Sequence, residues 1–327
     1  RDHLDYHKTY KNYFNSKLIL FKKLLKKKSY AIFDDDLKIS SNLNRITKSN
    51  KIEKFTIGNN KSSFTILEHQ FLKDEQNIIF RFDKKEYSFS TKLIGRVQIK
   101  NLLMAIMAAI KSKIPLEKIL KSTQKIKSVN GRLEKIGNLY NNGIVILDYA
   151  HTPDALTTCI KNVKEQFKLR KINLVFGCGG ERDRPKRKLM GRIADRYCDK
   201  IYLTDDNPRS EDPKKIRRDI KSNISKNKVL EIQSRESAIK SAIFDIKSNE
   251  VVIVAGKGHE VYQEYVSKKF FSDKKCIEKF IKIKNKSLSK YWKSNIVSEV
   301  TKKKIEKNIN IDEASIDSRK IKKNNIF

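Results

Sequence analysis

A regular alternation of short apolar runs and longer amphipathic segments, which begins at Gly131, constrains the fold of this chain most strongly. Short apolar runs predict buried strands, and the segments between them predict helices. The predicted strands are residues 144–147, 173–176, 200–203 and 250–255, and the predicted helices are residues 153–167, 186–197, 213–225 and 235–246. This order predicts an α/β fold with a mostly parallel, Rossmann-like sheet.

A polar or glycine-rich loop follows each predicted strand. The loops are residues 148–151 (Asp-Tyr-Ala-His), 177–180 (Gly-Cys-Gly-Gly), 204–207 (Thr-Asp-Asp-Asn) and 256–259 (Gly-Lys-Gly-His). Because the carboxyl ends of parallel strands meet at one edge of a sheet, we expect these loops to converge on a ligand-binding site.

The rest of the chain divides into an earlier and a later part. Before the alternation, residues 10–25 and 101–111 predict helices, and residues 63–67 and 77–82 predict a small antiparallel sheet. After it, residues 286–327 are lysine-rich and too few for an independent domain of this type. We therefore expect domains at residues 1–128 and 129–285, with residues 286–327 as a linker into a following domain.

The formal net charge of +35 invites a nucleic-acid-binding interpretation. The lysines are spread along the whole chain, however, and no RNA-binding or zinc-finger pattern accompanies them. We expect a solvated basic surface with no specific nucleic-acid site, and keep a non-catalytic nucleic-acid-binding module as an alternative.

Cysteine usage and hydropathy indicate a cytoplasmic protein. Cys159, Cys178, Cys198 and Cys276 lie far apart and form no metal-ligand pair, which is typical of a reducing compartment. No apolar run approaches the ~20 residues of a membrane span, so we expect no membrane insertion. Because the chain begins with Arg1 inside dense sequence, we expect its natural N-terminus to lie further upstream.

Two of the loops suit an amino-acid ligand. Arg209 can hold a carboxylate with two parallel hydrogen bonds, Asn207 offers both a donor and an acceptor, and Pro208 stiffens their loop. Residues 256–260 (Gly-Lys-Gly-His-Glu) permit close approach, and Glu260 can receive an ammonium group. The alternatives are a cap and turn before a helix at Pro213, and a tight turn with a solvated lysine and glutamate.

Two further motifs are weaker. Residues 177–183 offer backbone N–H groups and Arg182 to an anion, although an ordinary strand–helix turn also explains them. His3 and His7 have the i, i+4 spacing of metal ligands, although helix-start histidines are more often surface residues.

Seven segments in order resemble the Mur ligase family, and within it the members that add diaminopimelate. They are residues 1–7, 16–21, 131–134, 148–156, 176–183, 205–209 and 254–262. The resemblance covers about residues 1–285 and implies part of the family's central ligase domain, followed by its Rossmann-like C-terminal domain. It implies an ATP-dependent amide ligase of peptidoglycan precursor synthesis, with ATP and Mg²⁺ as cofactors. The implied substrates are UDP-N-acetylmuramoyl-L-alanyl-D-glutamate and meso-diaminopimelate, joined through an acyl phosphate.

The resemblance also implies residue roles. Lys17 matches the lysine that the family carbamylates to make an oxygen ligand for Mg²⁺, and His3 matches a metal-ligating histidine. The matches to nucleotide-contacting residues are Asn101, Arg132, Asp148 and His151. The matches to the diaminopimelate pocket are Arg182, Asp206, Asn207, Arg209, Gly256 and Glu260.

Three features depart from the family pattern or extend it. Gln98 stands where the family has asparagine before its asparagine-rich helix. The phosphate-binding loop would lie before Arg1, so we do not expect this chain alone to hydrolyse ATP. Residues 315–321 resemble the opening of a UDP-binding domain, which predicts a fusion to the ligase MurF; a random basic tail is the alternative. A related ligase that adds glutamate to folate is a further alternative, which the Asn-Pro-Arg loop disfavours.

Overall fold

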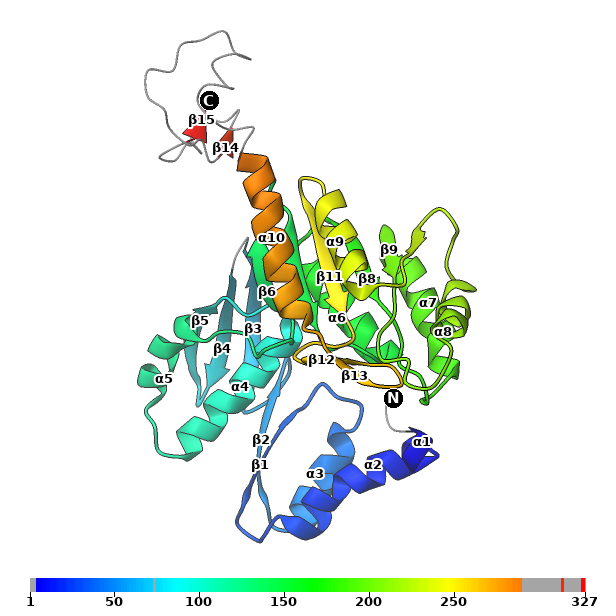
Figure 1. Cartoon of the computed structure of the whole chain (residues 1–327). Helices are drawn as coiled ribbons and strands as arrows, with labels where there is room; N and C mark the ends of the chain where they lie inside the picture. Colours follow the sequence, from blue (N-terminus) through cyan, green and yellow to red (C-terminus); the bar gives the residue numbers. More distant parts are fainter. Residues whose placement is uncertain (1–3, 73–74, 290–312, 315–324, 327) are drawn as a thin grey trace. The chain divides into compact units, whose positions relative to one another are not determined.

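The computed structural model describes residues 4–72, 75–289, 313–314 and 325–326 (Figure 1). It forms two compact units, the first made of Arg1–Val129 with Thr157–Lys168 and the second of Asn130–Leu156 with Leu169–Phe327. The expected boundary lay between residues 128 and 129, without the return of residues 157–168 to the first unit. The assignment of the segments to particular ligase domains stays a prediction.

The first unit contains a mixed five-stranded sheet in the order β1-β2-β3-β4-β5. Its strands are β1 (Tyr30–Asp34), β2 (Glu53–Gly58), β3 (Phe64–Phe71), β4 (Gln76–Phe82) and β5 (Lys85–Thr91). Strands β1 to β3 run parallel, and β3 to β5 form antiparallel pairs. The predicted antiparallel sheet is therefore correct for β3 to β5 only, because two parallel strands extend it on one side.

The main helix of the first unit is α4 (Arg96–Lys111), which begins five residues before the predicted start at residue 101. Ile99, Leu103 and Met107 of α4 are buried in one core with Phe64 and Phe80 of the sheet. The predicted helix at residues 10–25 is α2 (Tyr10–Ile19), followed by a π-helical turn, η1 (Leu20–Leu24). The remaining elements are α1 (Leu4–His7), α3 (Ser40–Ser49), α5 (Leu116–Ser122) and η2 (Thr123–Lys125).

The second unit contains a six-stranded sheet in the order β10-β9-β8-β11-β7-β6. Its strands are β6 (Glu134–Asn138), β7 (Ile144–Asp148), β8 (Lys171–Phe176), β9 (Lys200–Leu203), β10 (Val229–Glu231) and β11 (Glu250–Ala255). All neighbouring pairs are parallel except β6 with β7. The prediction of a mostly parallel α/β sheet is confirmed, and so are its four predicted strands.

The helices at the sheet of the second unit are α7 (Pro185–Tyr197), α8 (Pro213–Lys221), α9 (Arg235–Asp245) and α10 (Asp273–Ser289). Helices α9 and α10 lie side by side in Figure 1, and their Ile239 and Ile277 are buried in one core with Leu147 and Val254 of the sheet. Helix α6 (Pro153–Gln166) crosses from the second unit into the first.

A short hairpin and two very short strands complete the second unit. Strands β12 (Tyr262–Glu264) and β13 (Lys268–Phe270) form the hairpin, and β14 (Glu313–Ala314) pairs with β15 (Asn325–Ile326). The residues that resemble the start of MurF lie almost entirely outside the described residues. Within the described part of the chain, no helix is both long enough and apolar enough to cross a membrane.

Candidate amino-acid-binding site

The loops after β8 and β9 pack directly against each other. The N–H of Gly180 donates to the carbonyl oxygen of Asn207 at 2.9 Å. A Cβ atom on Gly180 would lie 1.9 Å from the carbonyl oxygen of Pro208, so only glycine fits there. The N–H of Gly180 therefore binds another loop of the protein instead of an anion. Glycine at this position allows the two loops to pack closely.

The side chain of Asn207 is held from three sides. Its Oδ1 accepts from Lys257 Nζ at 2.9 Å and from the N–H of Glu264 at 2.9 Å, and its Nδ2 donates to Glu260 Oε2 at 3.0 Å. The N-cap of α8 is Asp212, which accepts from the N–H of Lys214. Asn207 is therefore not the helix cap that the alternative interpretation expected.

Lys257 corrects one sequence-based interpretation. A solvated lysine was the alternative for this turn, but the residue is fully buried. Its ammonium group lies 2.9 Å from Glu260 Oε2 as well as 2.9 Å from Asn207 Oδ1. A buried charge requires such partners, because desolvation strongly disfavours an unpaired ion. Lys257 therefore joins the loop after β9 to the loop after β11.

The guanidinium of Arg209 is also held in place. Its Nη1 donates to the carbonyl oxygen of Gly180 at 2.7 Å, and its Nε lies 3.2 Å from Glu264 Oε2. The backbone of Arg209 has φ +55°, in the left-handed region, and its N–H donates to the carbonyl oxygen of Glu264 at 3.0 Å. A non-glycine residue in this region costs about 1–2 kcal/mol, so the surrounding contacts must hold it there.

Behind this loop lies a buried charge network. Arg235 is 1% exposed and forks Asp273 with contacts of 2.8 and 2.7 Å. Its Nη1 lies 3.7 Å from Asp206 Oδ2, and neither of these two atoms has a hydrogen-bond partner in the described structure. Gly256 has φ +119°, and a Cβ there would lie 2.6 Å from Asp206 Oδ2. Glycine at this position therefore leaves room for the Asp206 carboxylate.

A second group of predicted residues gathers around Tyr149. The carboxylate of Asp148 accepts from the N–H groups of Leu133 at 2.8 Å and Ala150 at 2.9 Å. The guanidinium of Arg132 lies 4.5 Å from the Tyr149 ring centroid. The His151 ring lies 4.6 Å from the same ring, and its Nδ1 is 2.9 Å from the Tyr149 carbonyl oxygen. These three predicted nucleotide contacts form one cluster at the end of β7.

Burial shapes the electrostatics next to the site. Asp205 pairs with Arg217 and accepts from the Tyr265 hydroxyl at 3.0 Å. Burial raises the pKa of the Asp205 carboxyl above its ordinary value, although the Arg217 guanidinium opposes this shift. Burial and the neighbouring Asp205 raise the pKa of the Tyr265 hydroxyl to about 12, so this hydroxyl stays protonated and can donate.

The other predicted site residues that the structure describes are exposed. Arg182 is exposed in the loop before α7. Lys17 and Asn101 belong to the first unit, where both are exposed, and Lys17 Nζ lies 5.0 Å from the Tyr13 ring centroid. His3 lies outside the described residues. Among the described residues, no group of three or more His, Cys, Asp or Glu side chains is placed to hold a metal ion.

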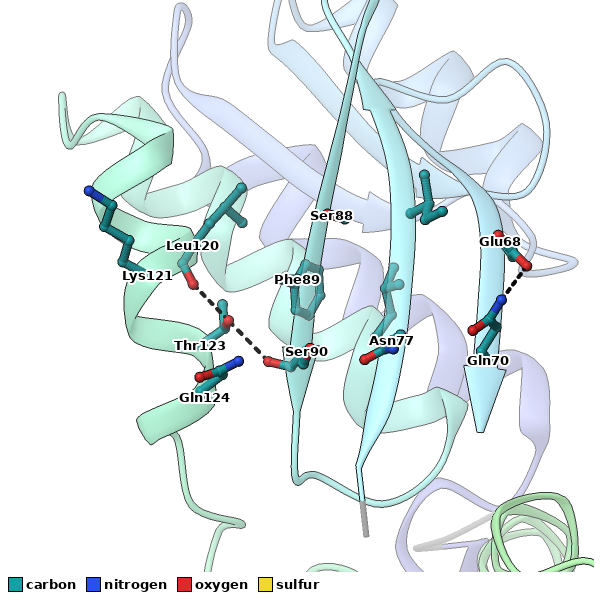
Figure 2. Close-up of a pocket in the computed structure, with 12 residues that line it drawn as sticks. Glu68, Gln70, Asn77, Ser88, Phe89, Ser90, Leu120, Lys121, Thr123 and Gln124 are labelled. Atoms are coloured by element: carbon teal, nitrogen blue, oxygen red, sulfur yellow. Dashed lines mark hydrogen bonds between the residues drawn. The ribbon is translucent and has the colours of Figure 1, made fainter. Parts of the chain in front are cut away.

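A hollow of about 670 Å³ lies elsewhere, on the face of the first unit's sheet beside α5 and η2 (Figure 2). The side chains of Asn77, Ser88 and Ser90 line it from the strands, and Lys121 and Gln124 line it from the helical side. None of the predicted site residues lines this hollow.

Sequence reasoning missed Lys257, Glu264 and Arg235 as parts of the site. The position of Lys257 between two glycines after a buried strand was the one available signal. Glu264 and Arg235 reach the site only through the β12–β13 hairpin and the start of α9. No local pattern marks such a contact.

Comparison with known proteins finds family matches in both parts of the chain. A family model described as "Mur ligase middle domain" matches residues 1–109, and one described as "Mur ligase, glutamate ligase domain" matches residues 131–258. The UDP-N-acetylmuramoyl-L-alanyl-D-glutamate–2,6-diaminopimelate ligase of Rickettsia rickettsii is 41% identical over 286 residues, which are 86% of this chain and 58% of that protein.

Solved structures give the same result. A structure of a UDP-N-acetylmuramoyl-L-alanyl-D-glutamate–2,6-diaminopimelate ligase matches with a TM-score of 0.60 and 30% identity, over 86% of this chain and 58% of that one. The MurF ligase of Thermotoga maritima in complex with ADP matches with a TM-score of 0.65 over 88% of this chain and 60% of that one; at 14% identity it shows the fold alone. The chain thus spans less than two thirds of the length of each of these relatives.

Proposed function

We propose that this chain, which belongs to the Mur ligase family, supplies the amino-acid-binding part of a UDP-N-acetylmuramoyl-L-alanyl-D-glutamate–2,6-diaminopimelate ligase. One observation carries the proposal: Asn207, Arg209 and Glu260 meet at one edge of the sheet, with their polar groups linked through Lys257 and Glu264. A cation and an anion set close together suit the carboxylate and ammonium groups of a free amino acid. The 41% identity to the Rickettsia rickettsii ligase supports the same substrate.

In the proposed reaction, ATP phosphorylates the D-glutamate side-chain carboxylate of the UDP-linked dipeptide. The amino group of meso-diaminopimelate then attacks the acyl phosphate, an amide bond forms and phosphate leaves. Arg209 holds the carboxylate at the distal end of diaminopimelate, and Glu260 with Asp206 faces its ammonium group. Arg182 adds a second cation, and Gly256 lets the substrate approach the backbone.

The nucleotide end of the reaction rests on other residues. Arg132, Asp148 and His151 are proposed to face a bound nucleotide, with Asn101 near the adenine. Mg²⁺ would screen the charge on the transferring phosphoryl group. The proposed ligands of this ion are carbamylated Lys17 and His3. The described residues show no complete ligand set, so no step is assigned to the metal.

Two further proposals extend beyond the site. Residues 286–327 are proposed to lead into a MurF-like domain, on the resemblance of residues 315–321 alone. The enzyme is proposed to act in the cytoplasm, which suits four buried cysteines that form no disulfide. Determining the mass of the natural protein, and its sequence after Phe327, tests the fusion.

The test of the function uses the full-length protein that carries this segment. With ATP, Mg²⁺ and the UDP-linked dipeptide, it is expected to incorporate meso-diaminopimelate far better than L-lysine and to release phosphate only in the complete mixture. Equal use of L-lysine would contradict the proposed selectivity. Ligation of neither amino acid would contradict the function, and a folate substrate accepted instead would favour the folate ligase.

A further inference from the structure

We propose that Glu264 is a positioning residue that determines how Arg209 receives a carboxylate, and so sets the selectivity of the site for an amino acid with a second carboxylate. This inference rests on the proposed function, because it assigns a role within the same amino-acid site. Glu264 ends strand β12 and belongs to none of the motifs that indicated the function.

Glu264 contacts both key residues of the loop after β9. Its carbonyl oxygen accepts from the N–H of Arg209 at 3.0 Å, and its own N–H donates to Asn207 Oδ1 at 2.9 Å. Its carboxylate adds a third contact, 3.2 Å from Nε of Arg209. The backbone contacts fix the path of the loop. Within the described part of the chain, the carboxylate pairs with the guanidinium alone.

The carboxylate leaves one end of the guanidinium available. Nη1 of Arg209 is used by the carbonyl oxygens of Gly180 at 2.7 Å and Asn207 at 3.4 Å, and Nε is used by Glu264. Among the residues that the structure describes, Nη2 has no hydrogen-bond partner. A guanidinium held at Nε and Nη1 cannot rotate freely, so it presents Nη2 to an incoming carboxylate in one orientation.

Partial burial strengthens this pair. The Arg209 side chain is 23% exposed and that of Glu264 is 27% exposed, so solvent screens their attraction less than it screens a surface pair. The distal end of meso-diaminopimelate carries both a carboxylate and an ammonium group, whereas the distal end of L-lysine carries only an ammonium group. Orientation of Arg209 therefore matters for the first substrate and not for the second.

The experiment compares Glu264→Ala and Glu264→Gln with the unaltered full-length ligase, using meso-diaminopimelate and L-lysine in turn. We expect Glu264→Ala to raise KM for diaminopimelate about tenfold with little change in kcat, since it removes the ion pair that holds Nε of Arg209. KM for L-lysine is expected to stay the same. Glu264→Gln should restore part of the loss, because it keeps a polar oxygen beside Nε of Arg209 although it lacks the negative charge.

Glu236→Ala is the matched control. Glu236 pairs with Lys279 at 2.9 Å on the surface of the same unit, and both side chains are at least half exposed. Glu236→Ala is expected to leave KM unchanged for both diaminopimelate and L-lysine. Because the Glu264 side chain is partly exposed and its backbone contacts survive the substitution, both Glu264 variants are expected to fold, and a thermal denaturation curve checks this.

The outcomes separate the two proposals. The unaltered enzyme can ligate diaminopimelate while Glu264→Ala shows an unchanged or lower KM for it. This result overturns the inference and leaves the proposed function standing. An equal rise of KM for both amino acids, or a fall of kcat alone, overturns it as well. An unaltered enzyme that ligates neither amino acid overturns the proposed function and this inference with it.

Discussion

The ammonium group of Lys257 lies 2.9 Å from Asn207 Oδ1 and 2.9 Å from Glu260 Oε2, fully shielded from solvent. This contact determines which way round the Asn207 amide stands, because its oxygen must face the cation and its nitrogen then faces Glu260. An aspartate at position 207 would instead set a second negative charge against Glu260. The amide is therefore a requirement of the network, in addition to its proposed role as a substrate contact.

Replacing Lys257 tests the network. Lys257→Met should lower the free energy of unfolding by about 2–4 kcal/mol, because it leaves the Glu260 carboxylate, with a side chain only 19% exposed, without its cation. Urea denaturation of the chain measures the loss. Lys279→Met, which removes the surface partner of Glu236, should leave the free energy of unfolding nearly unchanged. A Lys257→Met chain as stable as this control would show that the contact has no energetic weight.

Gly180→Ala tests the packing of the two loops. Its Cβ would lie 1.9 Å from the Pro208 carbonyl oxygen, so the loop after β9 must move, and a stability loss of about 2 kcal/mol or more is expected. Gly137→Ala is the matched control, because its nearest neighbour is the flexible end of the Ile281 side chain at 3.2 Å. The melting temperatures of the two variants measure the difference. Equal losses of stability in Gly180→Ala and Gly137→Ala would contradict the tight packing of the two loops.

The pairing of Glu211 with Arg187 predicts a pH dependence. Burial alone would raise the pKa of the Glu211 carboxyl, but the N–H of Glu181 and the Arg187 guanidinium, 2.9 Å away, outweigh burial, so the pKa lies below its ordinary value of 4.5. A carboxyl whose pKa is lowered by folding stabilises the protein above the unfolded-state pKa. That contribution is lost as the pH falls through the folded-state pKa.

Glu211→Gln should therefore be less stable than the unaltered chain by about 2 kcal/mol at neutral pH, since the Arg187 side chain is 2% exposed and loses the nearer of the two carboxylates paired with it in the described structure, keeping Asp219. The difference in the free energy of unfolding between the two chains should shrink as the pH falls below 4.5. Urea denaturation at a series of pH values measures it. A gap independent of pH would exclude the ionised pair as its cause.

The sequence predicted most of the second unit's large sheet because four of the six strands in that sheet are almost entirely buried and carry apolar runs. Strands β7, β8, β9 and β11 were located from such runs, and the polar loops after β8, β9 and β11 meet as expected. Strands β6 and β10 were missed, since β6 contains Gly137 and β10 has only three residues. In the first unit, the parallel strands β1 and β2 carry no distinctive alternation.

The contacts within the site were less predictable than its location. Lys257 looks like a solvated lysine in a chain with 73 lysine and arginine residues, and only the fold shows that it is buried. Glu264 lies 55 residues after Arg209, and the β12–β13 hairpin brings the two together. Long-range partners of this kind depend on tertiary packing, which local sequence patterns do not encode.

The central claim is that Arg209 holds the carboxylate that diaminopimelate has and L-lysine lacks. The most direct test is a competition assay in which the full-length ligase, unaltered or with Arg209→Lys, receives both amino acids together. We expect a strong preference for meso-diaminopimelate in the unaltered enzyme, and at least a tenfold loss of that preference (about 1.4 kcal/mol) in Arg209→Lys, because an ammonium group cannot reproduce the planar guanidinium. An unchanged preference in Arg209→Lys would contradict this account and place recognition of the carboxylate elsewhere.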